Sequence, residues 1–229
     1  AAGRRIHTIG AVNRQLPFMF GDAQVPESLF GAVLDHPRHD FDLFCPPNLP
    51  IATTEYLIAL HASALVRDGG TLQLGIGELG DALVYCLQLR HQQNRLYRQV
   101  LEDCRIPARF GAAVDGMGGG DVFSEGLYGC TEMFVDGFLD LFRAGILKRK
   151  VAPDGCLLHG GFFVGPKGFY AALRNMPESD RRLFNMTRVS YTNQLYGPDY
   201  EQRVAQRKDA RFINTSMMMT LLGAAVSDT

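Results

Sequence analysis

The fold class is decided by the stretch Gly70-Thr71-Leu72-Gln73-Leu74-Gly75-Ile76-Gly77-Glu78-Leu79-Gly80-Asp81-Ala82-Leu83. Its apolar run 71–74 has the length and composition of a short buried strand. The glycines after it predict a tight turn, and residues 81–89 then predict a helix. A buried strand that leads through a glycine turn into a helix is typical of α/β proteins.

The same alternation continues along the chain and extends this prediction. Thr53 or Thr54 is expected to cap a helix that runs to about Val66. Further helices are expected at about 133–146, at 167–174 behind Pro166, and near 200–208, and strands at 127–130, 157–164, 189–195 and 212–222. The glycine-rich segment 111–126 is expected to be a loop. Together these elements predict an open mixed or parallel sheet flanked by helices.

The first 50 residues differ from the rest. Prolines at positions 17, 26, 37, 46, 47 and 50 interrupt any regular periodicity. We therefore expect residues 1–50 to be an irregular segment and linker that follows a preceding domain, and residues 51–229 to form the α/β domain.

Composition excludes several classes of protein. The 229 residues include 23 basic and 24 acidic side chains, a net charge of −1, which argues against a nucleic-acid-binding surface. No uninterrupted apolar run approaches the 18 residues of a membrane span, and the N-terminus has no signal-like apolar region. Five widely spaced cysteines without a CxxC pair are typical of free thiols, which predicts a cytoplasmic protein.

The run Gly75-Ile76-Gly77-Glu78-Leu79-Gly80 also matches the G-x-G-x-x-G pattern of dinucleotide-binding turns. However, Glu78 and Asp81 place negative charge where a phosphate would bind. A nicotinamide-dependent oxidoreductase, and a purely structural turn, remain alternative interpretations of this run.

Four ordered blocks resemble the acetyl-CoA hydrolase and transferase family, which includes acetate, butyrate and 4-hydroxybutyrate CoA-transferases. The stretch 70–83 is similar to its "DGxTLQxGIGxxxDAV" segment, and residues 12–22 resemble its "VNxxMPxxxGD" segment. Residues 129–137, Gly-Cys-Thr-Glu-Met-Phe-Val-Asp-Gly, resemble its "HTEMxxDG" motif, and residues 212–216 resemble its "xINSA" strand. The resemblance implies the C-terminal α/β domain of a CoA-transferase.

The resemblance also implies a site and a reaction. Glu132 matches the glutamate that attacks the acyl-CoA carbonyl and becomes a glutamyl-CoA thioester, resolved by a small carboxylate or by water. Asn214 would stabilise the oxyanion, and Gly75, Ile76, Gly77, Glu78 and Leu79 would lie beside coenzyme A. Coenzyme A is then a substrate. We expect no metal, no nucleic-acid or membrane partner, and a homo-oligomer.

The chain departs from the family pattern near its end. Met218 and Thr220 stand at positions that are acidic in the family, and the sequence ends before the family's "GxGGQ" segment. The family's N-terminal α/β domain is also missing. These departures predict an incomplete domain and leave a rival function, a coenzyme A-binding or sensing domain with impaired catalysis. The methionines around Met218 are expected to pack in a core or to shape an acyl pocket.

Without the resemblance, the same residues have simpler interpretations. Glu132 could be an acid in the first turn of a helix, and Asn214 a strand-end side chain that bonds to backbone. Cys130 is an unfavourable nucleophile because no histidine lies near it in the sequence. The pair His36 and His39 lacks further ligands for a metal. The basic run 148–150 is interpreted as a solvated surface, or alternatively as a contact for the 3′-phosphate of coenzyme A.

Overall fold

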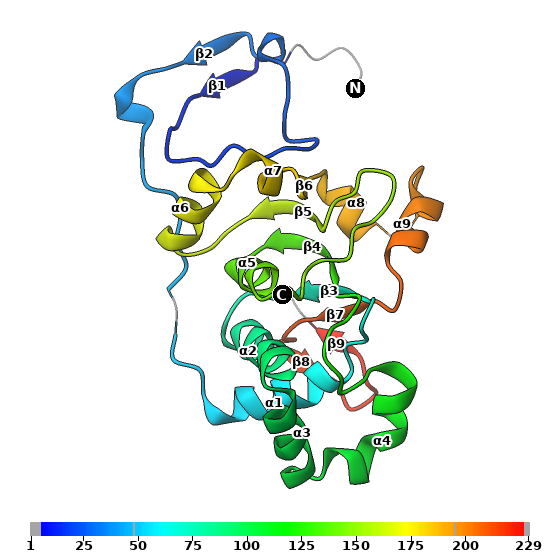
Figure 1. The fold of residues 1–229 in the computed structure, drawn as a ribbon. Coiled ribbons are helices and arrows are strands. Elements are labelled where there is room, and N and C mark those ends of the chain that lie inside the picture. The colour runs from blue at the N-terminus through cyan, green and yellow to red at the C-terminus, as the bar shows by residue number, and fades with distance from the viewer. Residues whose placement is uncertain (1–5, 48, 195, 227–229) are drawn as a thin grey trace.

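The structure is a computed structural model that describes residues 6–47, 49–194 and 196–226. Its centre is a five-stranded sheet in the order β6-β5-β4-β3-β7, and all four strand pairs are parallel (Figure 1). The strands are β3 (Thr71–Leu74), β4 (Tyr128–Phe134), β5 (Leu158–Phe163), β6 (Phe184–Met186) and β7 (Arg211–Ile213). The predicted open α/β sheet is confirmed, and the part that is described is parallel.

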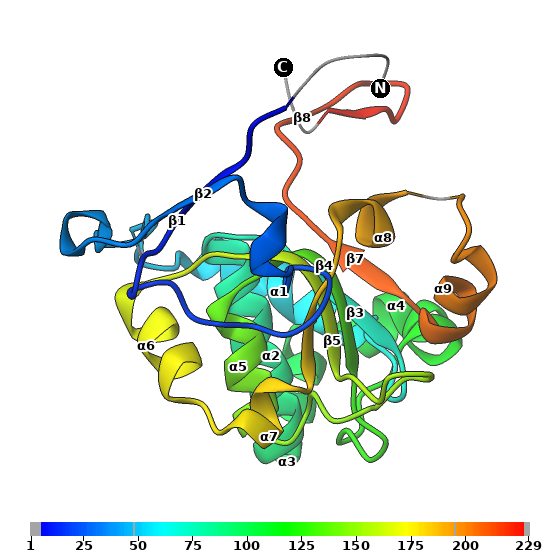
Figure 2. The same cartoon turned by 90° about the horizontal axis from the view of Figure 1, so that it is seen from above.

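Helices cover both faces of this sheet (Figure 2). The face that carries the main core packs against α1 (Thr53–Ala64), α2 (Glu78–Gln92), α5 (Asp136–Arg143) and α6 (Lys167–Asn175). The opposite face carries α8 (Val189–Asn193) and α9 (Tyr200–Gln206). The remaining helices are α3 (Asn94–Asp103), α4 (Ile106–Met117) and α7 (Glu178–Arg181). Because β7 returns beside β3 after β6, the helices before and after β6 lie on different faces.

The core follows from the apolar alternation of the strands. Leu72 and Leu74 of β3 and Phe134 of β4 are buried against the helices α2 and α5. Phe134 stacks on Phe184 with ring centroids 5.1 Å apart, which joins β4 to the edge strand β6. This packing fixes which face of each central strand is left for polar side chains.

The N-terminal segment contains β1 (Ile9–Ala11), β2 (Ala32–Leu34) and the 3-10 turns η1 (Glu27–Leu29) and η2 (Pro37–His39). Met186 of β6 donates its backbone N–H to Phe20 O, and Met186 O accepts from the N–H of Ala23. Asp22 accepts from the hydroxyl of Thr187 at 3.0 Å. The segment therefore covers the edge strand β6, which would otherwise leave unpaired backbone groups.

Two helix boundaries differ from the sequence prediction. The cap of α1 is Ala52, without a side-chain hydrogen bond, so neither Thr53 nor Thr54 caps this helix. Residues 133–134 belong to β4, and α5 begins only at Asp136. The apolar spacing of residues 133–142 suits both states, so periodicity alone could not separate the end of the strand from the helix.

Several loops and strands were also assigned wrongly. The predicted loop 111–126 contains the second half of α4, and the predicted strand 189–195 is the helix α8, with Leu195 outside the described residues. The predicted strand 212–222 is only β7, followed by a small antiparallel pair, β8 (Met218–Met219) and β9 (Ala225–Val226). Strand β6 was not predicted, because its three residues give too short a pattern to recognise.

The methionines at 217–219 lie outside the core, since each side chain is more than half exposed. The predicted core packing of this stripe is therefore wrong.

The basic run 148–150 is also not simply solvated, because Arg149 is half-buried and donates to Gly70 O, Thr71 Oγ1 and Gln206 O. Long basic side chains often bury their stems and use the head group to bond backbone carbonyls. Among the described residues, no helix combines the length and apolar character needed to cross a bilayer.

Candidate active site

Glu132 lies in the second half of β4, on the face opposite the main core. The side chains of Tyr128 and Cys130 lie on the same face, outside the main core. The alternation of side chains ends at the last residue of the strand, where Phe134 packs into the main core. This face is covered near Glu132 by the helix α8, which leaves Glu132 half-buried. The structure corrects the interpretation that Glu132 stands at a strand-to-helix turn. The helix begins four residues later, so Glu132 is not an acid of its first turn.

Asn193 at the end of α8 holds the Glu132 carboxylate. Its Nδ2 donates a hydrogen bond to Glu132 Oε2, and its own Oδ1 lies 3.1 Å from the hydroxyl of Thr192. An amide that is fixed by a neighbouring hydroxyl restricts the rotamers of the carboxylate it binds. No motif in the sequence predicts Asn193, since only the chain path from β6 to β7 carries α8 over β4.

Asn214 follows β7 directly, in the same cavity as Glu132. It forms a pair of hydrogen bonds with Gln73 of the neighbouring strand β3: Gln73 Nε2 donates to Asn214 Oδ1 at 2.8 Å, and Asn214 Nδ2 donates to Gln73 Oε1 at 2.9 Å. The structure thus brings Glu132 and Asn214 together, and the partner of Asn214 is a side chain, not the backbone.

This cavity has a volume of about 440 Å³ and combines polar and apolar side chains. Its lining comes from β3, β4, the end of α8, and the residues around α9 and β7: Gln73, Cys130, Thr131, Glu132, Met133, Thr192, Asn193, Gln194, Arg207, Phe212 and Asn214. Small-molecule sites commonly combine a partly apolar lining with a few convergent polar groups.

The glycine turn between β3 and α2 lines a second cavity, of about 270 Å³, on the opposite face. Gly75, Ile76, Gly77 and Glu78 face this cavity, whereas Leu79 packs against the hydrophobic core and does not line it. Of the five residues predicted to lie beside coenzyme A, four therefore line the cavity and Leu79 packs against the core.

Two positions of this turn require glycine for geometric reasons. Gly77 is the N-cap of α2 with φ +99°, a left-handed conformation that side chains rarely adopt. A Cβ at Gly80 would lie 2.3 Å from the carbonyl oxygen of Gly75. The G-x-G-x-x-G pattern thus has a structural cause in this chain, namely the close approach of the first turn of α2 to the end of β3.

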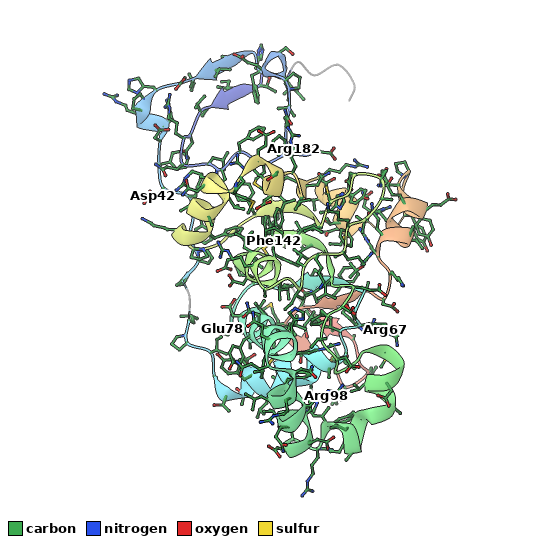
Figure 3. The ribbon with its side chains drawn as sticks, viewed as in Figure 1. Asp42, Arg67, Glu78, Arg98, Phe142 and Arg182 are labelled. Carbon is green, nitrogen blue, oxygen red and sulfur yellow. The ribbon has the colours of Figure 1, made fainter. Side chains whose placement is uncertain are left out.

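Three carboxylates line the second cavity, from Glu78, Asp81 and Asp136. Figure 3 labels Glu78 in the first turn of α2. The pKa of Asp81 is raised, chiefly by burial and further by the charges of Asp136 and Glu78, and burial also raises the pKa of Asp136. A pyrophosphate would meet repulsion here, which disfavours the dinucleotide interpretation of the glycine pattern.

Gly75, which lines the second cavity, lies next to the residues at the end of β7. Its N–H donates to Ile213 O at 3.0 Å, and a Cβ on Gly75 would lie 3.3 Å from Asn214 Oδ1. The Glu132 cavity is lined by residues at the end of α8, and the second cavity by residues of α2. In open α/β sheets ligands bind beyond the carboxyl ends of the strands, which is where β3 and β7 end at this site.

The remaining candidates do not form a second reactive centre. Burial raises the pKa of the Cys130 thiol, which favours the unreactive protonated form. Nδ1 of His36 accepts the backbone N–H of Arg38 at 3.1 Å, so this nitrogen is already used.

Within the described parts of the chain, one group of side chains is close enough to hold a metal ion: Asp154, Cys156 and His159, whose ligand atoms lie within 4.8 Å of one another. Hydrogen bonds account for this group. His159 Nε2 pairs with Asp154 Oδ2 at 2.8 Å, its Nδ1 pairs with the hydroxyl of Tyr128 at 2.7 Å, and Cys156 Sγ donates to Arg182 O.

Known proteins match this chain in sequence and in overall fold. No family model matches the sequence. The chain is 27% identical over 176 residues to a 4-hydroxybutyrate coenzyme A transferase of Clostridium kluyveri, an alignment that covers 74% of this chain and 31% of that protein. The crystal structure of a 4-hydroxybutyrate CoA-transferase from Porphyromonas gingivalis is 24% identical and covers 96% of this chain, with a TM-score of 0.62. In sequence and in fold, this chain is therefore similar to coenzyme A transferases.

The fold has a second close counterpart in the crystal structure of RipA from Yersinia pestis, which is 24% identical, covers 97% of this chain and has a TM-score of 0.67. The predicted resemblance and the predicted CoA-transferase fold are both confirmed. This chain spans 31% of the length of the Clostridium protein, 41% of RipA and 44% of the Porphyromonas enzyme.

Proposed function

We propose that this chain carries the acyl-transfer glutamate of an acyl-CoA:carboxylate CoA-transferase, and that Glu132 is this nucleophile. The observation that carries the proposal is the position of Glu132, in a cavity at the carboxyl ends of the strands with its carboxylate held by Asn193. The CoA-transferase resemblance of the sequence and the fold supports the same role.

The reaction follows from the chemistry of a carboxylate nucleophile. A Glu132 oxygen attacks the carbonyl carbon of an acyl-CoA, which forms an acyl-glutamyl anhydride and releases the coenzyme A thiolate. The thiolate attacks the glutamyl carbonyl, which expels the carboxylate product and leaves a glutamyl-CoA thioester. An acceptor carboxylate then reverses these steps, whereas attack by water would give hydrolysis.

Each attack on a carbonyl passes through an oxyanion that needs hydrogen-bond donors. Asn214 is our candidate donor. Its amide nitrogen carries two protons, and the pair with Gln73 uses one of them. The hydrogen bonds with Gln73 hold the Asn214 amide at the wall of the cavity that contains Glu132.

The second cavity suits the neutral part of coenzyme A. Its acids would repel the phosphates, whereas the acyl group and the pantetheine arm carry no charge. We propose that the turn Gly75–Glu78 lies beside this arm, and that the phosphates of coenzyme A bind outside this cavity.

The proposal is tested with the full-length protein and acetyl-CoA or butyryl-CoA. Intact mass measurement should detect a coenzyme A adduct that borohydride reduces at Glu132. The variant Glu132→Gln should form no adduct, while the control Glu102→Gln, an exposed glutamate of α3, should behave as the unsubstituted protein.

Other outcomes identify the rival functions. Coenzyme A binding without an adduct would favour a binding or sensing domain. A change in NADH fluorescence, with no coenzyme A binding, would favour a nicotinamide-dependent oxidoreductase. Either result would overturn the nucleophile role of Glu132.

A further inference from the structure

Arg207 lies just after α9 and lines the Glu132 cavity. Its Nη2 donates to the backbone carbonyl of Tyr191 and, at 3.2 Å, to that of Thr192. These bonds fix the guanidinium against the end of α8. Its Nε is buried and has no hydrogen-bond partner among the described residues.

The charge of Arg207 has no carboxylate partner within 4.0 Å in the described ranges, whereas nearby Arg188 pairs with both Asp22 and Asp199. Among the described residues that line the Glu132 cavity, Arg207 is the one with a positive charge. A half-buried guanidinium without a counter-ion is costly, and an anionic ligand would remove this cost.

The positive charge of Arg207 also changes the pKa values of neighbouring side chains. Burial raises the pKa of Cys130, and the positive charge of Arg207 opposes this rise. The pKa of His159 is lowered first by burial, and the Arg207 charge lowers it further. Both effects are those of a positive charge held close to this face of β4 and β5.

A carboxylate is the anion that best matches these features. A guanidinium presents parallel N–H donors that fit the two oxygens of a carboxylate, and such charge-assisted bonds are stronger than neutral ones. In the glutamyl-CoA state the Glu132 side chain is a neutral thioester. A second carboxylate can then approach without repulsion, and Arg207 is placed to bind it.

We propose that Arg207 binds the carboxylate of the acceptor acid and presents one of its oxygens to the Glu132 thioester. This inference rests on the proposed function of Glu132 and assigns the acceptor-binding residue of the same cavity. The acceptor oxygen attacks the thioester carbonyl and forms the mixed anhydride, and the electron pair of the broken C–S bond leaves with the coenzyme A thiolate.

The test uses the full-length protein with butyryl-CoA as donor and acetate as acceptor. Arg207→Gln keeps a neutral amide donor near the carbonyls of α8, Arg207→Lys keeps the charge on a single donor group, and Lys208→Met removes an exposed neighbouring charge as a control. Thermal melting establishes whether each variant is folded. If Arg207→Gln is not folded, the comparison of KM values is made with Arg207→Lys.

We expect Arg207→Gln to raise KM for acetate by about 10- to 100-fold, in line with the loss of a charged hydrogen bond. KM for butyryl-CoA should change by less than about twofold, and Arg207→Lys should fall between the two. Lys208→Met should leave both constants unchanged. In the absence of acetate, the Glu132 adduct should still form in Arg207→Gln.

Two results would overturn the role of Arg207. One is an unchanged KM for acetate in a folded Arg207→Gln that still forms the adduct. The other is an equal rise in both KM values, which indicates only a structural role in holding α8. Absence of the adduct in the unsubstituted protein would overturn the proposed function itself, by a measurement that does not depend on Arg207.

Discussion

The contact between Gly80 and Gly75 gives a prediction whose sign depends on the tertiary structure. Gly80 is the third residue of α2, and a Cβ there would lie 2.3 Å from Gly75 O and 3.3 Å from Gly75 C. Gly80→Ala therefore places a methyl group against the backbone of the turn that lines the second cavity.

The magnitude follows from two opposing effects. Real Cβ atoms hardly ever approach another heavy atom closer than 3.0 Å, so the turn or the first turn of α2 must move by at least about 0.7 Å. Overpacking of this kind costs about 1–3 kcal/mol. An alanine inside a helix gains about 0.8–1.0 kcal/mol over glycine. We expect a net loss of up to about 2 kcal/mol in the free energy of unfolding.

Gly111 provides a matched control for the same chemical change. It lies inside α4, has no left-handed φ, and its Cβ would meet nothing within 4 Å. Gly111→Ala should therefore raise the free energy of unfolding by about 0.5–1 kcal/mol, because only the helix propensity and unfolded-state entropy change.

Urea denaturation measures both variants, and the midpoint should move in opposite directions at a constant m-value. Gly80→Ala should also weaken the binding of coenzyme A, because the Gly75–Glu78 turn has to shift. Equal stabilisation by both substitutions would refute the reasoning, since it would show that the Gly80 contact does not constrain the turn.

Two further predictions concern buried charged and titratable groups. Arg90 is 1% exposed, and its guanidinium donates to the carbonyls of Val66 and Asp121. Arg90→Met should therefore lower the free energy of unfolding by about 2–4 kcal/mol. In the same denaturation assay, Arg95→Met on the surface should change the free energy of unfolding by less than about 0.5 kcal/mol. Burial lowers the pKa of His159 below its usual value of 6.5. The contribution of His159 to stability is therefore complete above pH 6.5 and is lost as the pH falls towards the folded-state pKa. His159→Gln should flatten the decline of stability below pH 6.5, by at most about 1.4 kcal/mol per pH unit, and an unchanged pH profile would contradict this.

Local sequence determined the central unit of the fold. The apolar run 71–74 and the glycines after it specify β3 and the turn into α2, since a four-residue buried strand and a crowded turn need only local chemistry. The end of β4 was harder to predict, because residues 133–134 suit a strand or a helix. Pairing of Met133 with Phe162 of β5 decides in favour of the strand.

The sequence by itself also singled out Glu132 and Asn214 as candidate site residues, because the ordered family blocks contain both. Their neighbourhood was decided by the tertiary structure. Asn193 and Arg207 enter the cavity only because the chain leaves β6, crosses the second face of the sheet as α8 and α9, and returns as β7 beside β3. Pairing between strands that are far apart in sequence sets this path, and no local pattern encodes it.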